Sequence, residues 1–585
     1  MMSTHSPFQL SAPAHLRWIT TATEHLIGLK TLNHYYHHRQ AGMSTREFLR
    51  YTLEKLGIDY TVHTGSLDSI ATNGPVVVVA NHPFGAIEGA ILSELLLSRR
   101  DDIQVLANEY LERIPELADI FIGVDVFETE KAAQKNYRGI KKAMQHLKQG
   151  GLLLVFPAGE VSSINWKTRQ ITDRTWNRII GTLIRKTEAT SVPIYIEGRN
   201  SKAFHIMGLV HRKLRTLMLA REMLNKNRQP IRLHIGDAIN YSELRSFTTD
   251  NNISHYLRLN TYLMANRHAS SSHPFSTNQK PVIDPIDNNL LAQDVYSLPQ
   301  PCLLLGQGAL QVYCAPAQLL PNVLKEIGRL REFSFRQTGE GTGLEIDLDK
   351  YDEHYLHLFI WNTDKQEIAG AYRLGLVDRL LTRQDIKALY SRSQFDYDHD
   401  FIESLGPSIE MGRSFICPGY QRSLNALLLL WKGIATFVYR NPGYTTLFGP
   451  VSISNEYSEL SRFLMASFLE IHYYDPTRAA RVRPTNPQQK PKHVFWTRDM
   501  LAALADKSVI SRLIARMEGG KGMPVLMRQY LKLNGRLVCF NVDKDFNNTL
   551  DGLIVVDLLN VPEKVLARYM GKQQTKEFFR RSLNE

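Results

Sequence analysis

The sequence predicts an α/β protein with two domains. At 585 residues the chain is about three times as long as a typical domain, so a single hydrophobic core is not expected. From 75 to 240, short apolar runs alternate with amphipathic helical segments, a pattern typical of a sheet that is buried on both faces. Residues 266–295 begin with a stretch rich in Ser, Asn, Pro and Asp that shows no hydrophobic period. We therefore expect a linker there, between domains 1–265 and 296–585.

The first domain combines buried strands with basic helices. The predicted strands are 75–80, 103–107, 120–124, 152–156, 193–196 and 231–235, and the predicted helices are 86–98, 132–148 and 211–226. Residues 131–150 contain six Lys or Arg and no acid, and 202–232 contain eight with apolar residues between them. With a net charge of +12, these stretches predict a surface for anionic headgroups or an acidic carrier protein, although any single Lys could simply be solvated.

The second domain shows another α/β pattern. We expect a helix over 316–332, then a hairpin with strands 355–361 and 367–375, a strand over 408–417 and a helix over 423–438.

Composition and patterning exclude several classes of protein. The four cysteines form no close pair, which argues against a disulfide scaffold or a Cys-rich zinc site, and no other metal-ligand spacing occurs. No apolar run reaches the ~18 residues that span a bilayer, and the amino terminus lacks the basic start and apolar core of a signal peptide. We expect a cytoplasmic protein that lies on the inner membrane face without crossing it. A nucleic-acid binder is not favoured, because no aromatic RNP-like pattern accompanies the basic residues.

The segment 81–89 (NHPFGAIEG) is the most informative part of the sequence. A buried strand ends at His82, passes a Pro/Gly turn and enters a helix with Glu88 in its first turn. A neutral imidazole at the carboxyl end of a strand is well placed to take a proton from a hydroxyl group. An ionised Glu88 could orient the ring and stabilise the imidazolium. The alternative is a helix-capping turn in which His82 satisfies a backbone group.

A second segment, Phe156-Pro157-Ala158-Gly159-Glu160, also follows a buried strand. Together the two segments resemble the N-H-x4-D and F-P-E-G-T blocks of the lysophospholipid acyltransferase superfamily. The resemblance implies transfer of an acyl group from a thioester to a hydroxyl, with His82 as base, Glu88 as its partner, and Phe156, Pro157, Gly159 and Glu160 in the acceptor-binding block. Here the spacing is H-x5-E, and Ala158 stands where the family has Glu.

In the second domain, the order of helix, hairpin, strand, turn and helix resembles the GNAT superfamily of N-acyltransferases. In that family the turn and the helix amino terminus receive the phosphates of the acyl donor. By position, the donor-binding residues are Gln421, Arg422, Asn425 and Ala426. Leu424 replaces the first glycine of the family turn and hinders a close phosphate. We therefore expect an acyl carrier protein as the donor, and no cofactor beyond its acyl thioester.

More specific are the segments 331–335, 349–352, 371–374 and 410–413, together with 523–533 and 540–546. This series is similar to the N-acylating ornithine-lipid enzymes, which themselves resemble acyl-homoserine-lactone synthases. N-acylation requires an α-amine to lose a proton, and Glu410, on a strand in the expected cleft, is the candidate base or water-relay residue. Asp349 and Asp352 would hold the cationic side chain of the amino acid, and the other binding residues would be Arg331, Arg373 and Arg413, of which Arg373 or Arg413 would pair with its carboxylate. The alternative is that these charged groups are structural ion pairs and turns.

Both resemblances together indicate the bifunctional ornithine-lipid synthases of bacteria. The implied reactions are N-acylation of ornithine by a 3-hydroxyacyl-acyl carrier protein, followed by O-acylation of the lyso-ornithine lipid. The alternative is a phospholipid-remodelling acyltransferase fused to an unrelated small-molecule N-acyltransferase.

Overall fold

The structure, a computed structural model, forms two compact units. The described residues are 24–25, 27–108, 111–112, 114–124, 132–165, 170–226, 230–266, 279–382, 385–421, 424–491 and 494–582. The first unit comprises Met1–His268 and Phe495–Val509, and the second comprises Ala269–Val494 and Ile510–Glu585. The division after His268 lies inside the expected linker. The segment Phe495–Val509, which the sequence assigns to the second domain, belongs to the first unit.

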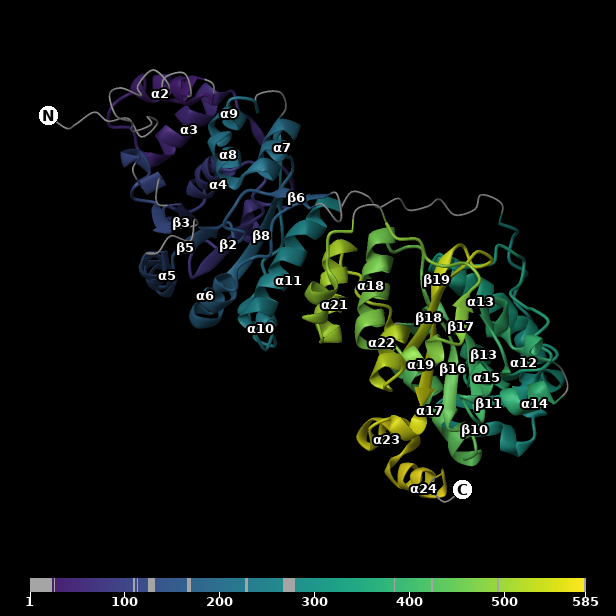
Figure 1. Cartoon of the computed structure of the whole chain (residues 1–585). Coiled ribbons are helices and arrows are strands. Elements are labelled where there is room, and N and C mark those ends of the chain that lie inside the picture. The colour runs from purple at the N-terminus through teal and green to yellow at the C-terminus, as the bar shows by residue number, and fades with distance from the viewer. Residues whose placement is uncertain are drawn as a thin grey trace. The chain divides into compact units, whose positions relative to one another are not determined.

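The first unit is built on a seven-stranded sheet (Figure 1). In spatial order its strands are β1 (Tyr60–Thr64), β9 (Ile231–Ile235), β8 (Thr190–Ile196), β2 (Val76–Ala80), β5 (Leu152–Val155), β3 (Ile103–Asn108) and β4 (Phe121–Val124). The neighbours pair in parallel except β8 and β9. All five residues of β2 are buried, as the continuous apolar run predicts for a central strand.

Helices cover both faces of this sheet and hold it between two layers. The helices of the first unit are α2 (Leu29–His37), α3 (Thr45–Leu56), α4 (Ala86–Leu97), α5 (Ala132–Lys148), α6 (Ile179–Thr187), α7 (Lys202–Val210), α8 (Arg212–Leu217), α9 (Leu219–Met223), α10 (Tyr241–Leu244), α11 (Asp250–Leu263) and α20 (Arg498–Ala502). A small hairpin of β6 (Ser163–Asn165) and β7 (Gln170–Thr172) follows β5.

The second unit is built on an eight-stranded mixed sheet. In spatial order its strands are β10 (Leu303–Gln307), β11 (Leu310–Pro316), β12 (Leu356–Asn362), β13 (Glu367–Leu376), β15 (Ser408–Ile416), β16 (Thr446–Ile453), β19 (Thr549–Asp557) and β18 (Arg536–Asp543). Only β15 and β16 pair in parallel, and they do so over Ser408–Glu410 alone. Beyond Glu410 the two strands separate, so the sheet is splayed.

The longest helix of the second unit, α17 (Leu424–Arg440), packs against β10 to β13 (Figure 1). The other helices of at least eight residues are α12 (Asn288–Tyr296), α13 (Val323–Gln337), α18 (Glu459–His472), α21 (Lys507–Met517), α22 (Val525–Lys532), α23 (Glu563–Met570) and α24 (Lys572–Ser582). The shorter elements are α14 (Val377–Leu381), α15 (His399–Glu403), α16 (Pro418–Gln421), α19 (Pro476–Ala479), β14 (Phe395–Tyr397) and β17 (Val482–Pro484).

The predicted fold class, α/β with a splayed mixed sheet in the second domain, is confirmed, but two helix predictions are wrong. The helix expected over 316–332 begins only at Val323, two residues after Pro321, because proline has no N–H and cannot lie inside a helix. The helix expected over 211–226 is two short helices, α8 and α9. No helix within the described ranges is long and apolar enough to cross a bilayer.

Candidate functional site

The first candidate site lies where β2 and β5 end side by side. The two strands are parallel neighbours, so the segments that follow them leave the sheet at the same edge. The backbone N–H of Ser162 donates to the carbonyl of His82 at 2.8 Å and ties these segments together. The Asn81 amide exchanges two hydrogen bonds with the backbone of Ile196, at 2.9 and 2.7 Å. The position of His82 is thus fixed by three neighbouring strands of the sheet.

The imidazole of His82 contacts the carboxylate of Glu88. Its Nδ1 lies 2.9 Å from Oε1 of Glu88, in a close ion pair that is not an aligned hydrogen bond. The same oxygen accepts the backbone N–H groups of Phe84 and Gly85, each at 2.9 Å, so Glu88 also caps α4. Gly85 has a φ of 111°, and a Cβ there would lie 2.9 Å from the Leu219 side chain. The capping turn and the base–carboxylate pair are therefore one structure.

One side of the His82 ring stays accessible. The Nδ1 atom is buried, and 18% of the side chain is exposed. Because Glu88 occupies the Nδ1 side, Nε2 is the ring nitrogen left for a substrate hydroxyl. This is the geometry that a general base oriented by a carboxylate requires.

The pH dependence of O-acylation tests this pair. Burial lowers the pKa of His82, but the Glu88 carboxylate and, after it, Asp173 raise it, and the net pKa is above 6.5. Because only neutral imidazole accepts a proton, O-acylation should fall as the pH drops through this raised pKa. Glu88→Gln removes the main raising charge, so the midpoint of kcat/KM against pH should move to lower pH. Glu54→Gln, at an exposed position, is the control, and an equal midpoint in Glu88→Gln would contradict the pairing.

The sequence reading missed a buried carboxylate beside His82. Asp173 is 3% exposed, and its Oδ1 accepts the backbone N–H of His82 at 3.2 Å and the hydroxyl of Ser162 at 2.5 Å. Its Oδ2 accepts the indole N–H of Trp176 at 3.0 Å. Burial raises the pKa of Asp173, and these hydrogen bonds partly offset the increase. Asp173 therefore positions the backbone of the base and adds a second negative charge near it.

A segment of the carboxy-terminal half helps to place Asp173. The backbone N–H of Asp173 donates to the Tyr262 hydroxyl at 2.7 Å, and the backbone carbonyl of Asp173 accepts from Arg258 at 2.6 Å. Phe495 packs on Tyr262 with ring centroids 5.4 Å apart, and Met500 contacts Arg258. Phe495 and Met500 thus support the first site, although they lie more than 200 positions beyond Tyr262 and Arg258 in the chain.

The predicted acceptor-binding block lies beside His82. The Phe156 ring is 4.6 Å from the imidazole, centroid to centroid, at an interplanar angle of 33°. Pro157 is buried, while Gly159 is exposed with a φ of 68°, a left-handed conformation that glycine adopts without strain. Glu160 is paired with Arg174 and, at 2.7 Å, with Arg215 of α8. The Glu160 charge is therefore compensated by the protein, which leaves its role in acceptor binding a prediction.

The second candidate site is a cavity of about 510 Å³ in the second unit. It opens where β15 and β16 separate, and β15 lines it from Met411 to Ile416. The opposite wall includes Lys521–Leu526, which leads into α22. A volume of this size accepts an extended acyl chain together with a small acceptor.

Arg413 enters the cavity wall at an irregularity of β15. Its φ is 50°, which is uncommon for a residue other than glycine, and the pairing of β13 with β15 shifts register at this point. Such strain persists where the surroundings hold it and is frequent at functional sites. The guanidinium donates to the Tyr390 hydroxyl at 3.0 Å and lies 4.2 Å from the Phe546 ring centroid.

The charged residues expected to bind the amino acid mostly bind one another. Arg331 donates to Asp352 at 2.8 Å, and Arg373 donates to Asp349 at 2.6 Å, with both arginines 0% exposed. None of these four residues lines the cavity. Of the predicted acceptor-binding set in this unit, only Arg413 does. We therefore interpret the other four as a buried structural network.

Glu410 also lies away from the cavity. It is 1% exposed, and its carboxylate accepts the hydroxyl of Tyr355 and the backbone N–H groups of Tyr390 and Ser391, the latter two at 3.0 and 2.7 Å. Glu410 can therefore act on an amine in the cavity only through a relay, and its role as base or water-relay residue stays a prediction.

The predicted donor-binding turn lies partly at the cavity. Gln421 lines it and donates to the carbonyl of Ile416 at 2.9 Å. Asn425 is exposed in the first turn of α17, and Ala426 is buried. Arg422 lies outside the described residues. The amino terminus of α17 therefore begins beside the cavity, as expected for a donor-phosphate site.

Four carboxylates to which the sequence assigned no role also line the cavity: Glu340, Glu456, Asp543 and Asp551. Glu456 is paired with Lys521, and the other three form an acidic cluster. Burial raises the pKa of Glu340 to about 8, and the Asp551 and Glu456 charges add to this effect. Burial likewise raises the pKa of Asp551 to about 7, with a contribution from Asp543. The raised pKa values mean that the surroundings of this acidic cluster do not compensate the full negative charge of its ionised form.

Two regions of the chain match models of known families. Residues 11–271 match the family described as Acyltransferase, and residues 330–432 match the acetyltransferase (GNAT) domain. The glycine N(alpha)-acyltransferase of Bacteroides thetaiotaomicron is 30% identical over 278 residues, which cover 44% of this chain and 81% of the relative. That of Phocaeicola vulgatus is 30% identical over 248 residues, which cover 39% of this chain and 74% of the relative.

The chain belongs to the same acyltransferase family as the Bacteroides thetaiotaomicron relative. The acyltransferase is also similar to the lyso-glycine lipid O-acyltransferase of Phocaeicola vulgatus, with 26% identity over 209 residues, or 33% of this chain and 72% of the relative. This single chain is therefore similar both to N-acyltransferases and to an O-acyltransferase.

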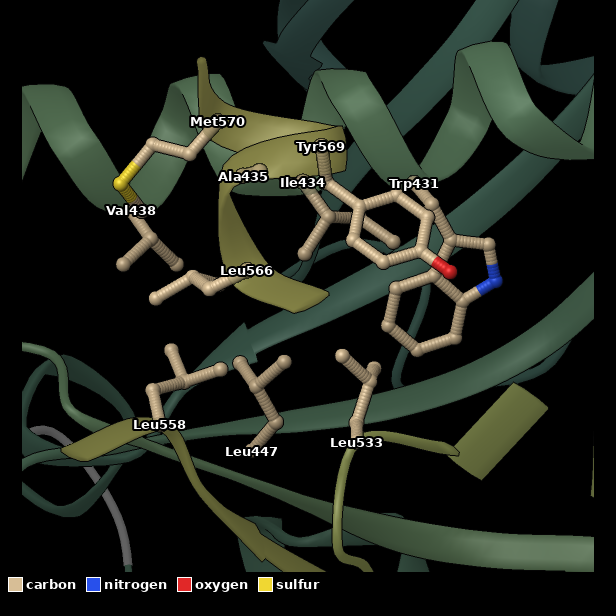
Figure 2. Close-up of a pocket in the computed structure, with 10 residues that line it drawn as sticks. All are labelled: Trp431, Ile434, Ala435, Val438, Leu447, Leu533, Leu558, Leu566, Tyr569 and Met570. Atoms are coloured by element: carbon tan, nitrogen blue, oxygen red, sulfur yellow. The ribbon is translucent and has the colours of Figure 1, made fainter. Parts of the chain in front are cut away.

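A second cavity of the acyltransferase serves packing. It measures about 20 Å³ and is lined by apolar and aromatic side chains, in which Val438 of α17 lies near Leu566 and Met570 of α23, and Trp431 of α17 lies beside Tyr569 (Figure 2). Such a volume holds no substrate. The cavity marks the contact through which α23 supports α17, the helix that begins at the donor turn.

Proposed function

We propose that this acyltransferase makes ornithine lipid by two successive acyl transfers. In the second unit, a 3-hydroxyacyl group passes from an acyl carrier protein to the α-amine of ornithine. In the first unit, the hydroxyl of the resulting lyso-lipid is acylated from a second acyl carrier protein. The similarity of one chain to N-acylating and O-acylating lipid enzymes carries this proposal. The relatives are named for glycine, so glycine is the competing acceptor.

The first transfer forms an amide and releases a thiol. The neutral α-amine attacks the thioester carbonyl, the C–S bond breaks, and the amine proton leaves as the carrier thiol forms. The wide cavity between β15 and β16 supports this step, because its apolar part, with Phe415, Leu427 and Leu526, suits an acyl chain, while Arg413 suits a carboxylate.

The second transfer forms an ester. The lyso-lipid hydroxyl gives its proton to Nε2 of His82 as its oxygen attacks the thioester, and Glu88 stabilises the imidazolium at Nδ1. The C–S bond then breaks, and the proton returns to the departing thiolate.

We further propose that the first unit lies on the anionic inner face of a membrane. Three apolar side chains of α7 and α8 are exposed: Ile206 at 59%, Leu209 at 41% and Leu217 at 41%. The exposed Lys202 and Arg221 lie in the same helical region. Apolar and basic side chains together suit an interface with anionic headgroups.

Expression of the full chain in a host without amino-acid lipids tests the proposed function. Mass spectrometry of the total lipid should find a new ninhydrin-positive, phosphate-free lipid with one amide-linked and one ester-linked acyl chain. A change confined to phospholipid acyl chains would instead support the remodelling alternative. Purified protein given lysophosphatidate or lyso-ornithine lipid separates the two directly, because the proposal requires preference for the latter.

A further inference from the structure

The acidic cluster is built from three separate parts of the second unit. Asp543 of β18 and Asp551 of β19 lie on the same face of the hairpin, because Asp543 pairs with Thr549 and Asp551 lies two residues further along. Glu340 follows α13, and the loop that carries it is tied to the turn of that hairpin by a hydrogen bond of 2.9 Å from Asn547 to the Gly339 carbonyl. Local sequence therefore does not explain why the three acids converge.

One carboxylate of the cluster lacks a partner that a buried acid normally has. Asp551 is 3% exposed, it lines the cavity, and its Oδ1 has no hydrogen-bond partner. Glu340 is partly buried and lines the same cavity. Asp543 accepts the Gln394 amide and the backbone N–H of Asp545. A buried acid oxygen without a donor is costly, so Asp551 points to a ligand that supplies the donor, with Glu340 in the same cavity as a second acceptor.

The nearby cations do not fill this role. Lys521 lines the same cavity but is paired with Glu456, and Arg413 contacts Asp347 and Asp349, at 3.3 and 3.4 Å. The Arg413 charge partly offsets the raised pKa of Asp543, whereas the pKa values of Glu340 and Asp551 stay raised to about 8 and about 7. The missing partner is a small cation with several N–H donors, which describes a primary ammonium group.

We infer that Glu340 and Asp551, with Asp543 beside them, bind the side-chain ammonium of a diamino-acid acceptor and thereby select it over amino acids without a second amine. The inference rests on the proposed N-acylation. An α-amine that attacks a thioester must be neutral, so glycine would bring no cation to the cluster. The acids would then face an uncharged methylene group. A site built to bind a polar group rejects analogues that lack the group, because its own polar atoms stay unpaired.

Acceptor competition with the purified full chain tests the inference. The donor is a 3-hydroxyacyl-acyl carrier protein, and the acceptors are ornithine, glycine and norvaline, which has the carbon skeleton of ornithine without the terminal amine. The wild-type chain should favour ornithine over norvaline by at least about 100-fold in kcat/KM. Glu340→Gln and Asp551→Asn should each lower kcat/KM for ornithine by about 10- to 100-fold and leave norvaline within about two-fold.

Two features keep this experiment decisive. Norvaline turnover reports on folding, and Asp545→Asn removes an exposed acid next to the cluster as a charge-matched control. Equal use of norvaline and ornithine by the wild-type chain, or equal losses for both in the variants, would overturn the inference while the N-acylation itself stands. Absence of any amino-acid acylation would instead overturn the proposed function, and the inference with it.

Discussion

Replacement of His82 by Ala is expected to stop lipid synthesis at the singly acylated amide. The ester-forming step should slow by about 10²- to 10⁴-fold, the usual contribution of a positioned general base. Without the imidazole, nothing at the end of β2 accepts the hydroxyl proton, and the Glu88 carboxylate, which is 0% exposed, cannot be reached by substrate. Mass spectrometry of the lipids made by the variant should show the lyso-lipid accumulating while the diacyl product disappears.

The matched control for this prediction is His37→Ala, which removes an exposed imidazole from α2. That variant should make diacyl lipid at the wild-type rate, and N-acylation should be unchanged in both proteins. Continued ester formation at the wild-type rate in His82→Ala would remove His82 from its proposed role, whatever the state of the second unit.

Replacement of Arg331 by Met should give the largest loss of stability. The guanidinium is fully buried and donates to Asp352, which also lies 3.3 Å from Arg373. The Arg331 charge helps to hold the pKa of the Asp352 carboxyl far below its usual value, so the variant would leave that carboxylate undercompensated. Removing one member of a buried charge network typically costs about 3–5 kcal/mol. We expect a loss of this size in the free energy of unfolding of the second unit.

Urea unfolding of the full chain measures this effect. Arg379→Met, at an exposed position of α14, is the control and should cost no more than about 1 kcal/mol. A similarly small cost for Arg331→Met would show that the network does not stabilise the fold. It would also reopen the earlier expectation that these residues contact the amino acid.

The first site is largely predictable from the sequence because its central parts are close in the chain. A buried strand, a Pro/Gly turn and a helix start form one continuous segment, and the interval between His82 and Glu88 corresponds to the turn plus the first helical turn. The helix-capping alternative does not exclude the catalytic one, since Glu88 does both. Asp173 could not be found this way, because its contact with His82 spans 91 positions and crosses the β6–β7 hairpin.

The second site is less predictable because the splayed sheet assembles it. The sequence places β15 at the cleft correctly, but it does not show where β15 separates from β16 or that Arg413 lies at an irregularity. Glu410 still lies in the paired part of β15, whereas Arg413 lies beyond it, so Arg413 lines the cavity and Glu410 does not. Glu340 and Asp551 are 211 positions apart and meet only through tertiary contacts. No local pattern marks either residue.

The central claim is that one chain first acylates an amino acid and then esterifies the product. The most direct test incubates the purified full chain with isotope-labelled ornithine and two acyl carrier proteins, one with a 3-hydroxyacyl chain and one with an acyl chain of another length. Mass spectrometry over time should show a labelled lyso-lipid with the hydroxyacyl amide first, and then a labelled diacyl lipid with the second chain as its ester. Absence of labelled amide would contradict the claim, as would a lyso-lipid that is never esterified.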